Sequence, residues 1–334
     1  MSILFVAIIA ILNISQIKSI NPLFKQWNCV GIIDNINFRK PYSFQIGHLP
    51  LVLWKHNDIL TAKLNICPHM ASSLSNADIT NAGCLKCKYH GMEFETDKSF
   101  GKVIEFQGKL FWSFDPIKSL PSSIPYFDDP TYCGHYLQID MPCSLVDSAL
   151  NTMDIRHPQY VHSMGFGNDK QPYDIIETKN DETKEVSVSF NYHSNELIRS
   201  INGGVKHTQN KHIYVFPSTT YSVVSFANNN LVIGVNLLPL ENKKTRWFVS
   251  ILHNYNTDKI GIKFINILAK TILLQDFTQL QNQFMDCELK KEVIFGESFD
   301  NEMSVKWLNE WFREEYKLPS MEDCVELCRD LKKK

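Results

Sequence analysis

Several features that would mark other protein classes are missing from this chain of 334 residues. It has no long basic run apart from residues 332–334, and its formal net charge is only −2, which argues against a nucleic-acid partner. No G-x-G-x-x-G segment is present, so NAD(P)H would have to be oxidised by another protein. There is also no internal repeat and no low-complexity tract. The 44% hydrophobic and 12% aromatic content is enough to fill the cores of two globular domains.

The first residues are apolar but match neither a membrane-spanning helix nor a secretory signal. The continuous apolar run covers residues 3–12, whereas a spanning helix needs about 20 residues. No basic residue precedes the run and no A-x-A-like cleavage site follows it. Attachment to a membrane surface through residues 3–12 is therefore left as an open hypothesis.

The most informative pattern is a pair of short motifs, each with one cysteine and one histidine. One residue separates Cys67 from His69, two separate Cys87 from His90, and residues 70–86 lie between the motifs. In a Rieske [2Fe–2S] centre two thiolates bind one iron and two imidazoles bind the other. The four residues therefore predict a Rieske cluster.

Zinc is the alternative for the same region. Cys84 and Cys87 form a C-x-x-C pair, which could make a Cys3His site together with Cys67 and either His69 or His90. A zinc ribbon usually has a second C-x-x-C pair, whereas the first half here is C-x-H. This difference favours the Rieske interpretation and leaves Cys84 without a metal.

A second motif, N-x2-D-x2-H-x4-H, begins at Asn151 and ends at His162. His157 and His162 could supply the imidazoles of a 2-His-1-carboxylate site, which leaves open positions on Fe(II). Five residues apart, they would point about 140° away from each other on an ideal helix. Both can bind one iron only if the helix is widened or broken there, and Pro158 favours such a break.

Together these motifs resemble those of the Rieske non-haem iron oxygenases. The similarity covers most of residues 24–290, and residues 27–114 look like the Rieske domain of such oxygenases. It is nearest to the oxygenase (alpha) subunits of the branch with pheophorbide a oxygenase, vanillate demethylase and 3-ketosteroid 9α-hydroxylase.

The resemblance assigns roles to further residues. Asp154 would link His90 of a neighbouring subunit to His157, and Asn151 would support the iron ligands without binding the metal. Read alone, Asp154 and Asn151 would each be typical helix caps. The segment at residues 273–283 looks like the helix that carries the third iron ligand, which favours Asp276.

Two other carboxylates, Asp286 and Glu288, remain alternatives for the third iron ligand. Each of the three candidates could also be an ordinary exposed acidic residue.

The resemblance also implies a reaction. The protein would be a monooxygenase or dioxygenase with O2 as co-substrate and Fe(II) as the mononuclear metal. It would hydroxylate, demethylate or desaturate a hydrophobic ring-containing substrate, with a sterol-like compound as the first choice. A separate reductase or ferredoxin would supply electrons, and the subunits would form a homotrimer. One alternative is a Rieske electron-transfer protein with a non-catalytic second domain, and another is a zinc-stabilised binding protein.

The predicted fold is α+β, with an all-β Rieske domain followed by a helix-grip (START-like) antiparallel-sheet catalytic domain. We expect an apolar segment at 1–23, the Rieske domain at 24–115, a proline-rich linker at 116–130 and the catalytic domain at 131–334. Strands are predicted in the Rieske domain at 51–55 and 109–114 and in the catalytic sheet at 186–192, 212–216, 221–226, 231–238 and 246–253. A long apolar helix at 259–285 would cover that sheet.

The cysteine count bears on the compartment. The chain has nine cysteines, an odd number, and two of them are assigned to the cluster. A disulfide framework is therefore not indicated, and we expect a reducing compartment, either cytoplasmic or organellar.

Overall fold

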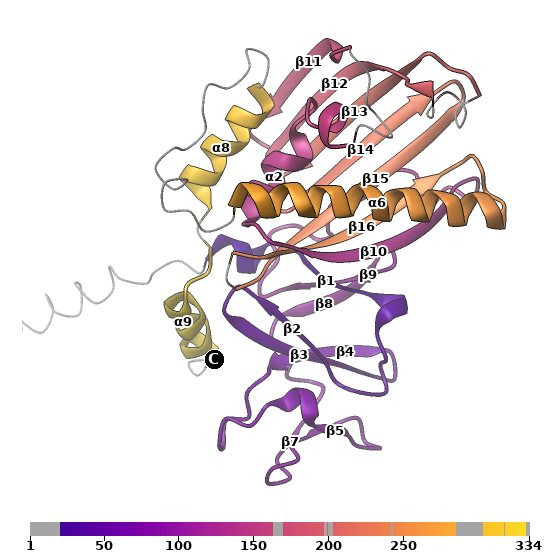
Figure 1. The fold of residues 1–334 in the computed structure, drawn as a ribbon. Coiled ribbons are helices and arrows are strands. Elements are labelled where there is room, and N and C mark those ends of the chain that lie inside the picture. Colours follow the sequence, from indigo (N-terminus) through magenta and orange to yellow (C-terminus); the bar gives the residue numbers. More distant parts are fainter. Residues whose placement is uncertain are drawn as a thin grey trace, which may run out of the picture.

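A computed structural model describes residues 21–162, 170–196, 199, 203–241, 243–284, 303–316 and 318–331. The hypothetical attachment segment, residues 3–12, lies outside this part of the chain. The described residues form an N-terminal all-β domain and a larger C-terminal domain built on one sheet (Figure 1). No helix among them is long and apolar enough to cross a membrane.

The N-terminal domain consists of three antiparallel sheets with the orders β1-β9-β8, β2-β3-β4 and β5-β6-β7. Its strands are β1 Asn28–Ile32, β2 Tyr42–Ile46, β3 Leu49–His56, β4 Ile59–Leu64, β5 Asp78–Ile79, β6 Leu85–Lys86, β7 Glu93–Phe94, β8 Lys102–Phe106 and β9 Lys109–Ser113. Its short 3-10 turns are η1 Pro22–Lys25, η2 Ile33–Asn35 and η3 Leu74–Asn76. The two strands predicted in this region are confirmed as β3 and β9.

The proline-rich segment after β9 contains neither helix nor strand between residues 115 and 130, as its four prolines predicted. It is held to the N-terminal domain by hydrogen bonds at two places. Near its start the Trp27 indole donates to the Lys118 carbonyl at 2.8 Å, and further on Gln107 binds Ile124. The Gln107 amide donates to the Ile124 carbonyl at 3.0 Å and accepts from the Ile124 amide at 2.8 Å. The linker is thus fixed against β8 and β9.

The C-terminal domain contains a seven-stranded antiparallel sheet with the order β10-β16-β15-β14-β13-β12-β11. Its strands are β10 Cys133–Met141, β11 Tyr173–Asn180, β12 Glu185–His193, β13 His207–Val215, β14 Thr219–Phe226, β15 Asn229–Pro239 and β16 Thr245–His253. The five predicted strands are the inner five, and both edge strands were missed. Side chains on β10 and β11 are half-buried or exposed almost throughout, so the apolar signal used to predict strands is weak there.

Helices cover one face of this sheet (Figure 1). The long helix α6, Lys259–Phe284, crosses the strands, and α2, Leu145–Met153, and α8, Met303–Glu315, lie on the same side. Apolar side chains of these helices and of the sheet share one buried core. The prediction of a long helix over 259–285 is confirmed for residues 259–284, and residue 285 lies outside the described residues.

The last helix, α9 Met321–Leu331, packs elsewhere. Its residues Cys324 and Leu327 are buried in the core of the N-terminal domain. The end of the chain therefore contacts the first domain, although the sequence places it after the second.

A buried lysine joins the two domains. Lys109, the first residue of β9, is 1% exposed, and its ammonium group donates to Asn236 Oδ1 at 2.8 Å and to Ser250 Oγ at 2.7 Å. Asn236 lies on β15 and Ser250 on β16 of the large sheet. No carboxylate in the described part of the chain pairs with Lys109, and burial lowers its pKa to about 8.

This lysine predicts a pH dependence of stability. In the folded protein Lys109 loses its proton near pH 8, against 10.5 for an ordinary lysine. Between these two pH values the unfolded chain binds more protons at this lysine than the folded protein does. The free energy of unfolding should therefore rise with pH, by on the order of 3 kcal/mol in total. Lys109→Met should abolish this contribution. The measurement is urea unfolding of both proteins between pH 7 and 10, and a difference that does not change with pH would contradict the assignment.

Candidate metal centres

The two cysteine-histidine motifs form neighbouring loops of the N-terminal domain. Cys67 and Cys87 are buried, whereas His69 and His90 are exposed, with ring centroids 4.6 Å apart. A hydrogen bond from the Tyr89 amide, together with the neighbouring Cys67 thiol, lowers the pKa of Cys87. The loops therefore present thiols on the inside and imidazoles to the surface, which suits a cluster with one exposed iron.

Both loops are closed in the same way. The amide of Ala71 donates to the Cys67 carbonyl at 2.8 Å, and the amide of Gly91 donates to the Cys87 carbonyl at 2.9 Å. Both donors have left-handed backbones, with φ of 57° at Ala71 and 74° at Gly91. In the second loop the amides of Tyr89 and His90 also hydrogen-bond to the Cys87 sulfur, and such amide bonds to sulfur are typical of iron–sulfur sites.

Gly83 lies next to these loops and has a specific packing role. Its φ is +85°, and a Cβ there would lie 2.3 Å from the ring of His56. The Trp54 indole also donates to its carbonyl at 2.9 Å. Cys84, the next residue, forms no disulfide with any cysteine in the described part of the chain.

The second motif lies at the break between two helices. A capping box formed by Ser144 and Asp147 begins α2, which ends at Met153, and a single turn, α3 Pro158–Val161, follows. His157 and His162 flank this turn as its two caps. The predicted break is present, but it comes before Pro158, which starts the new turn at a position that needs no N–H.

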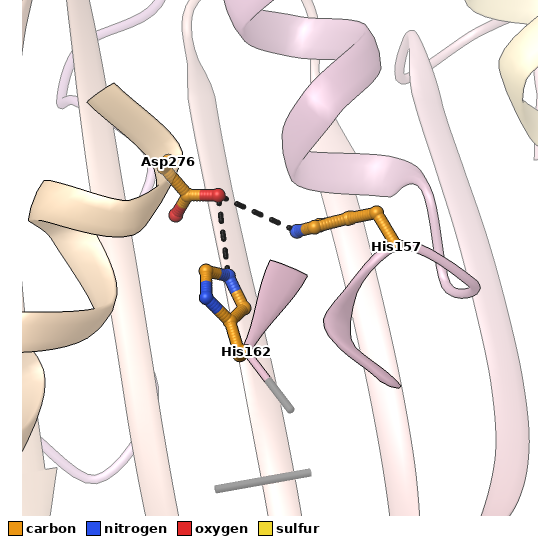
Figure 2. A group of neighbouring side chains, drawn as sticks. All are labelled: His157, His162 and Asp276. Carbon is orange, nitrogen blue, oxygen red and sulfur yellow. Dashed lines mark ion pairs between the residues drawn. The ribbon is translucent and has the colours of Figure 1, made fainter. Parts of the chain in front are cut away.

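Asp276 on α6 faces both imidazoles (Figure 2). Its Oδ1 atom is 3.5 Å from His157 Nε2 and 3.2 Å from His162 Nε2. One ligand atom from each of the three residues lies within 4.8 Å of the others, and no other such group occurs among the described residues. Two imidazoles and one carboxylate on one side of a metal form the facial triad of non-haem iron sites.

Both imidazoles are oriented by hydrogen bonds at their other nitrogen. His157 Nδ1 donates to the Asp154 carbonyl at 2.8 Å, and His162 Nδ1 donates to Gln275 Oε1 at 3.0 Å. Nε2 is therefore the nitrogen that each ring presents to Asp276 and that could bind a cation. Such orienting bonds are typical of metal-binding histidines.

The charges of the three groups are coupled. Burial by itself lowers the pKa of His157, but the carboxylates of Asp276 and Asp154 outweigh it and the net shift is upward. Burial raises the pKa of Asp276, but the facing imidazoles of His157 and His162 outweigh it and the net shift is downward. Asp276 is therefore held ionised, the form that binds a metal cation.

The residues present fit a mononuclear iron. Asp276 Oδ1 is buried without a hydrogen bond, although two ring nitrogens lie within 3.5 Å of it. A cation coordinated by all three groups would satisfy this oxygen. His157, His162 and Asp276 are the residues that would hold it.

The remaining predicted residues lie beside this group. The Asp154 carboxylate is 37% exposed, and its Oδ1 accepts from the amides of Arg156 at 2.8 Å and His157 at 3.2 Å. It thus caps the turn while its other oxygen, Oδ2, lies 3.8 Å from His157 Nδ1. Asn151 lies one turn earlier on α2. Their roles in electron transfer and support remain predictions.

The two alternatives to Asp276 as the third iron ligand, Asp286 and Glu288, lie outside the described residues. Gln275 was not anticipated as a partner of His162, although it directly precedes the favoured Asp276. His212 on β13 was also missed. Burial and, to a smaller extent, the charge of His157 together lower its pKa to about 4.

An apolar cavity lies between α6 and the sheet. It has a volume of about 110 Å³ and is lined by Tyr192, His193, Ser194, Asn195, Thr208, Val224, Phe226, Leu231, Ile233, Val249, Ile251, Tyr255, Phe264, Ile265, Leu268, Ala269, Ile272 and Leu273. None of these described lining residues is Asp, Glu, Lys or Arg. Ile272 and Leu273 precede Asp276 by about one helical turn, so the cavity approaches the triad along α6.

Large aromatic side chains of the second domain differ in whether they line this cavity or pack in a core. Phe226 lines the cavity. Phe216 and Trp247 pack in the main core of the second domain, and Tyr221 packs in a small cluster around Ile124. Three of these four aromatic side chains thus pack in a core, and one lines the cavity.

The geometry predicts how iron binding responds to substitution. His157→Ala should remove iron from this site while the visible spectrum of the cluster persists, because the two metal sites use different residues.

Gln275→Ala should weaken iron binding by roughly 10–100-fold, because His162 would lose the bond that orients its ring. Metal analysis and chelator competition measure both effects, with exposed His207→Ala as control. Loss of cluster and iron together would show that the two sites are not independent.

Comparisons with known proteins agree with this arrangement. Residues 26–110 match the family model of the Rieske [2Fe-2S] domain. The chain is 34% identical over 162 residues to the oxygenase component of dicamba O-demethylase from Stenotrophomonas maltophilia, covering 41% of this chain and 46% of that protein. It is also 34% identical over 170 residues to pheophorbide a oxygenase from Oryza sativa, covering 41% of this chain and 32% of that protein. These matches thus span less than half the length of either relative.

Solved structures extend the similarity to nearly the whole chain. Dicamba monooxygenase bound to dicamba aligns with a TM-score of 0.66 and 17% identity, covering 87% of this chain and 96% of that one. NdmA of Pseudomonas putida CBB5 with caffeine aligns with a TM-score of 0.69 and 16% identity, covering 87% and 90%. Residues 26–110 thus form a Rieske [2Fe–2S] domain, and over 87% of its length the chain has the fold seen in dicamba monooxygenase and NdmA.

Proposed function

We propose that this protein is the terminal oxygenase component of a Rieske-type oxygenase. It would use O2 and externally supplied electrons to hydroxylate, demethylate or desaturate a hydrophobic ring-containing substrate. The observation that carries the proposal is the buried group of His157, His162 and Asp276 beside an apolar cavity, in the same chain as a Rieske domain. An electron carrier would need neither the second metal site nor the cavity.

Each site residue has a role in this proposal. Cys67, His69, Cys87 and His90 would hold the [2Fe–2S] cluster, which stores single electrons. His157, His162 and Asp276 would hold Fe(II), which supplies the site where O2 is activated.

The cavity supports an apolar substrate. Its described lining is almost entirely hydrocarbon, and its volume of about 110 Å³ is of the order of a cavity that accepts benzene, roughly 150 Å³. One ring would fit inside, and a larger sterol-like molecule would extend through the opening. Relatives named for dicamba and pheophorbide a, and a neighbouring structure that holds caffeine, are consistent with a ring compound.

The position of the cluster loops supports electron transfer between subunits. The β5–β7 end of the N-terminal domain lies at one end of the molecule, and the other strands of that domain lie between it and α2 and α6 (Figure 1). Electrons would therefore pass from His90 of one subunit to Asp154 of the next, in a homotrimer. The half-exposed Asp154 carboxylate, next to His157, suits such a contact. A separate reductase or ferredoxin would reduce the cluster.

We also propose a reducing compartment, cytoplasmic or organellar, with residues 3–12 as a hypothetical attachment to a membrane surface. No disulfide joins the described cysteines, and a rice relative is named as chloroplastic.

Metal analysis tests the main proposal. Anaerobically purified protein should contain about three iron and two acid-labile sulfide per chain, which is the sum of a Rieske cluster and one mononuclear iron. About two iron and two sulfide, unchanged after incubation with Fe(II), would support the electron-carrier alternative. Zinc without sulfide would overturn the assignment of both sites.

Asp154→Asn tests the route between subunits. An asparagine oxygen can still accept from the amides at positions 156 and 157, so both metals should remain bound. Turnover with a reductase and O2 should fall by roughly 10²-fold or more, because electrons would no longer reach the iron efficiently. A single reaction cycle started from fully reduced protein should reveal slow electron transfer. Asp128→Asn, in the exposed linker, is the control, and unchanged turnover of Asp154→Asn would contradict the bridging role.

A further inference from the structure

The outer side of α6 carries a row of exposed apolar side chains. Ile260 is 80% exposed, Phe264 44%, Ile267 56% and Leu274 59%. Their spacings of four, three and seven residues place them in one stripe along about four helical turns. Single exposed apolar residues are common, but four on one side of a single helix, interrupted only by the half-buried Thr271, indicate an interaction surface.

A row of lysines borders this stripe. Lys259, Lys263 and Lys270 are exposed, and at 100° per residue they lie roughly 60–100° to one side of the stripe. Between residues 259 and 284 the only other charged residue is the buried Asp276. This combination of apolar and positive side chains is complementary to a bilayer surface with anionic headgroups.

The cavity opens on the other side of the stripe. Phe264, Leu268 and Ile272 line the cavity and follow one another around the helix, away from the lysines. Phe264 belongs to both the stripe and the cavity lining, so the cavity reaches the surface beside the exposed apolar side chains.

We propose that this outer face of α6 docks on an anionic membrane surface. The stripe enters the headgroup region, the lysines contact lipid headgroups, and an apolar substrate passes from the bilayer into the cavity beside Phe264. The substrate route rests on the proposed oxygenase function, whereas the docking does not. Hydrophobic compounds partition into bilayers, so docking in this orientation gives the cavity access to them.

Vesicle binding of the full-length holoprotein tests the docking. The protein should sediment with vesicles of equal parts phosphatidylserine and phosphatidylcholine, and much less with pure phosphatidylcholine. Replacing Lys259, Lys263 and Lys270 with Gln should weaken binding by roughly 10²-fold at low salt. The double variant Ile260→Glu/Ile267→Glu should weaken it by roughly tenfold or more. Both sites are exposed and glutamate suits a helix, so cluster absorbance and thermal unfolding should remain unchanged.

Matched controls separate this face from the rest of the chain. Replacing Lys40, Lys102 and Lys118 together with Gln changes the net charge equally, but in the N-terminal domain and the linker. Ile176→Glu places one charge at an exposed apolar site on β11. Both controls should bind vesicles like the wild type. Wild-type binding by the α6 variants would overturn the proposal and assign any binding to another part of the chain, such as residues 3–12.

Two further outcomes would also overturn the docking. These are wild-type protein that binds neither vesicle, and a stripe that mediates self-association, seen as an oligomer that the double variant abolishes without any vesicle binding. None of these measurements needs turnover. If the protein does not dock but contains three iron per chain, the oxygenase proposal stands and the docking proposal fails. If it docks but contains only two iron per chain, the docking proposal stands and the oxygenase proposal fails.

Discussion

The carboxylate of Asp276 lies in the protein interior between two imidazoles, and much of the second domain serves to keep it there. A carboxylate at this depth is costly unless opposite charge or a metal compensates for it. The long helix α6 brings Asp276 across the sheet, while the break between α2 and α3 brings His157 and His162 from the other side. The backbone carbonyl of Asp154 and the side chain of Gln275 then fix the ring orientations. These contacts define a cation site before any cation binds.

The same helix performs several tasks, and this explains its unusual composition. Its inner side provides the ligand and the wall of the cavity, so it must be apolar there. Its outer side is also apolar at four exposed positions, which a helix facing only water would not require. Residues such as Phe264 lie between the two surfaces. In the two proposals above, one continuous helix would carry an iron ligand, a wall of the substrate cavity and a membrane-docking face.

The two domains form one unit although their metal sites lie far apart in each chain. Lys109 anchors β9 to the large sheet, and α9 returns from the end of the chain to the core of the first domain. A rigid connection of this kind fixes the distance between the cluster loops and the iron group of the same chain. The proposed route from the exposed imidazole of His90 to Asp154 of a neighbouring subunit would not require this distance to change.

The sequence by itself determined the chemistry of both sites, because metal ligands are few residue types with restricted spacing. The C-x-H and C-x2-H motifs predicted the Rieske domain, and hydrophobic periodicity predicted the inner strands and α6. Edge strands β10 and β11 could not be found, because their polar, exposed side chains carry little periodic signal. Only the tertiary structure brought Asp276 to the histidines, since more than a hundred residues separate them and local spacing carries no information on such contacts. The tertiary structure also decided which groups Lys109 and Gln275 contact and which side of α6 is exposed, because each of these depends on which surfaces pack together.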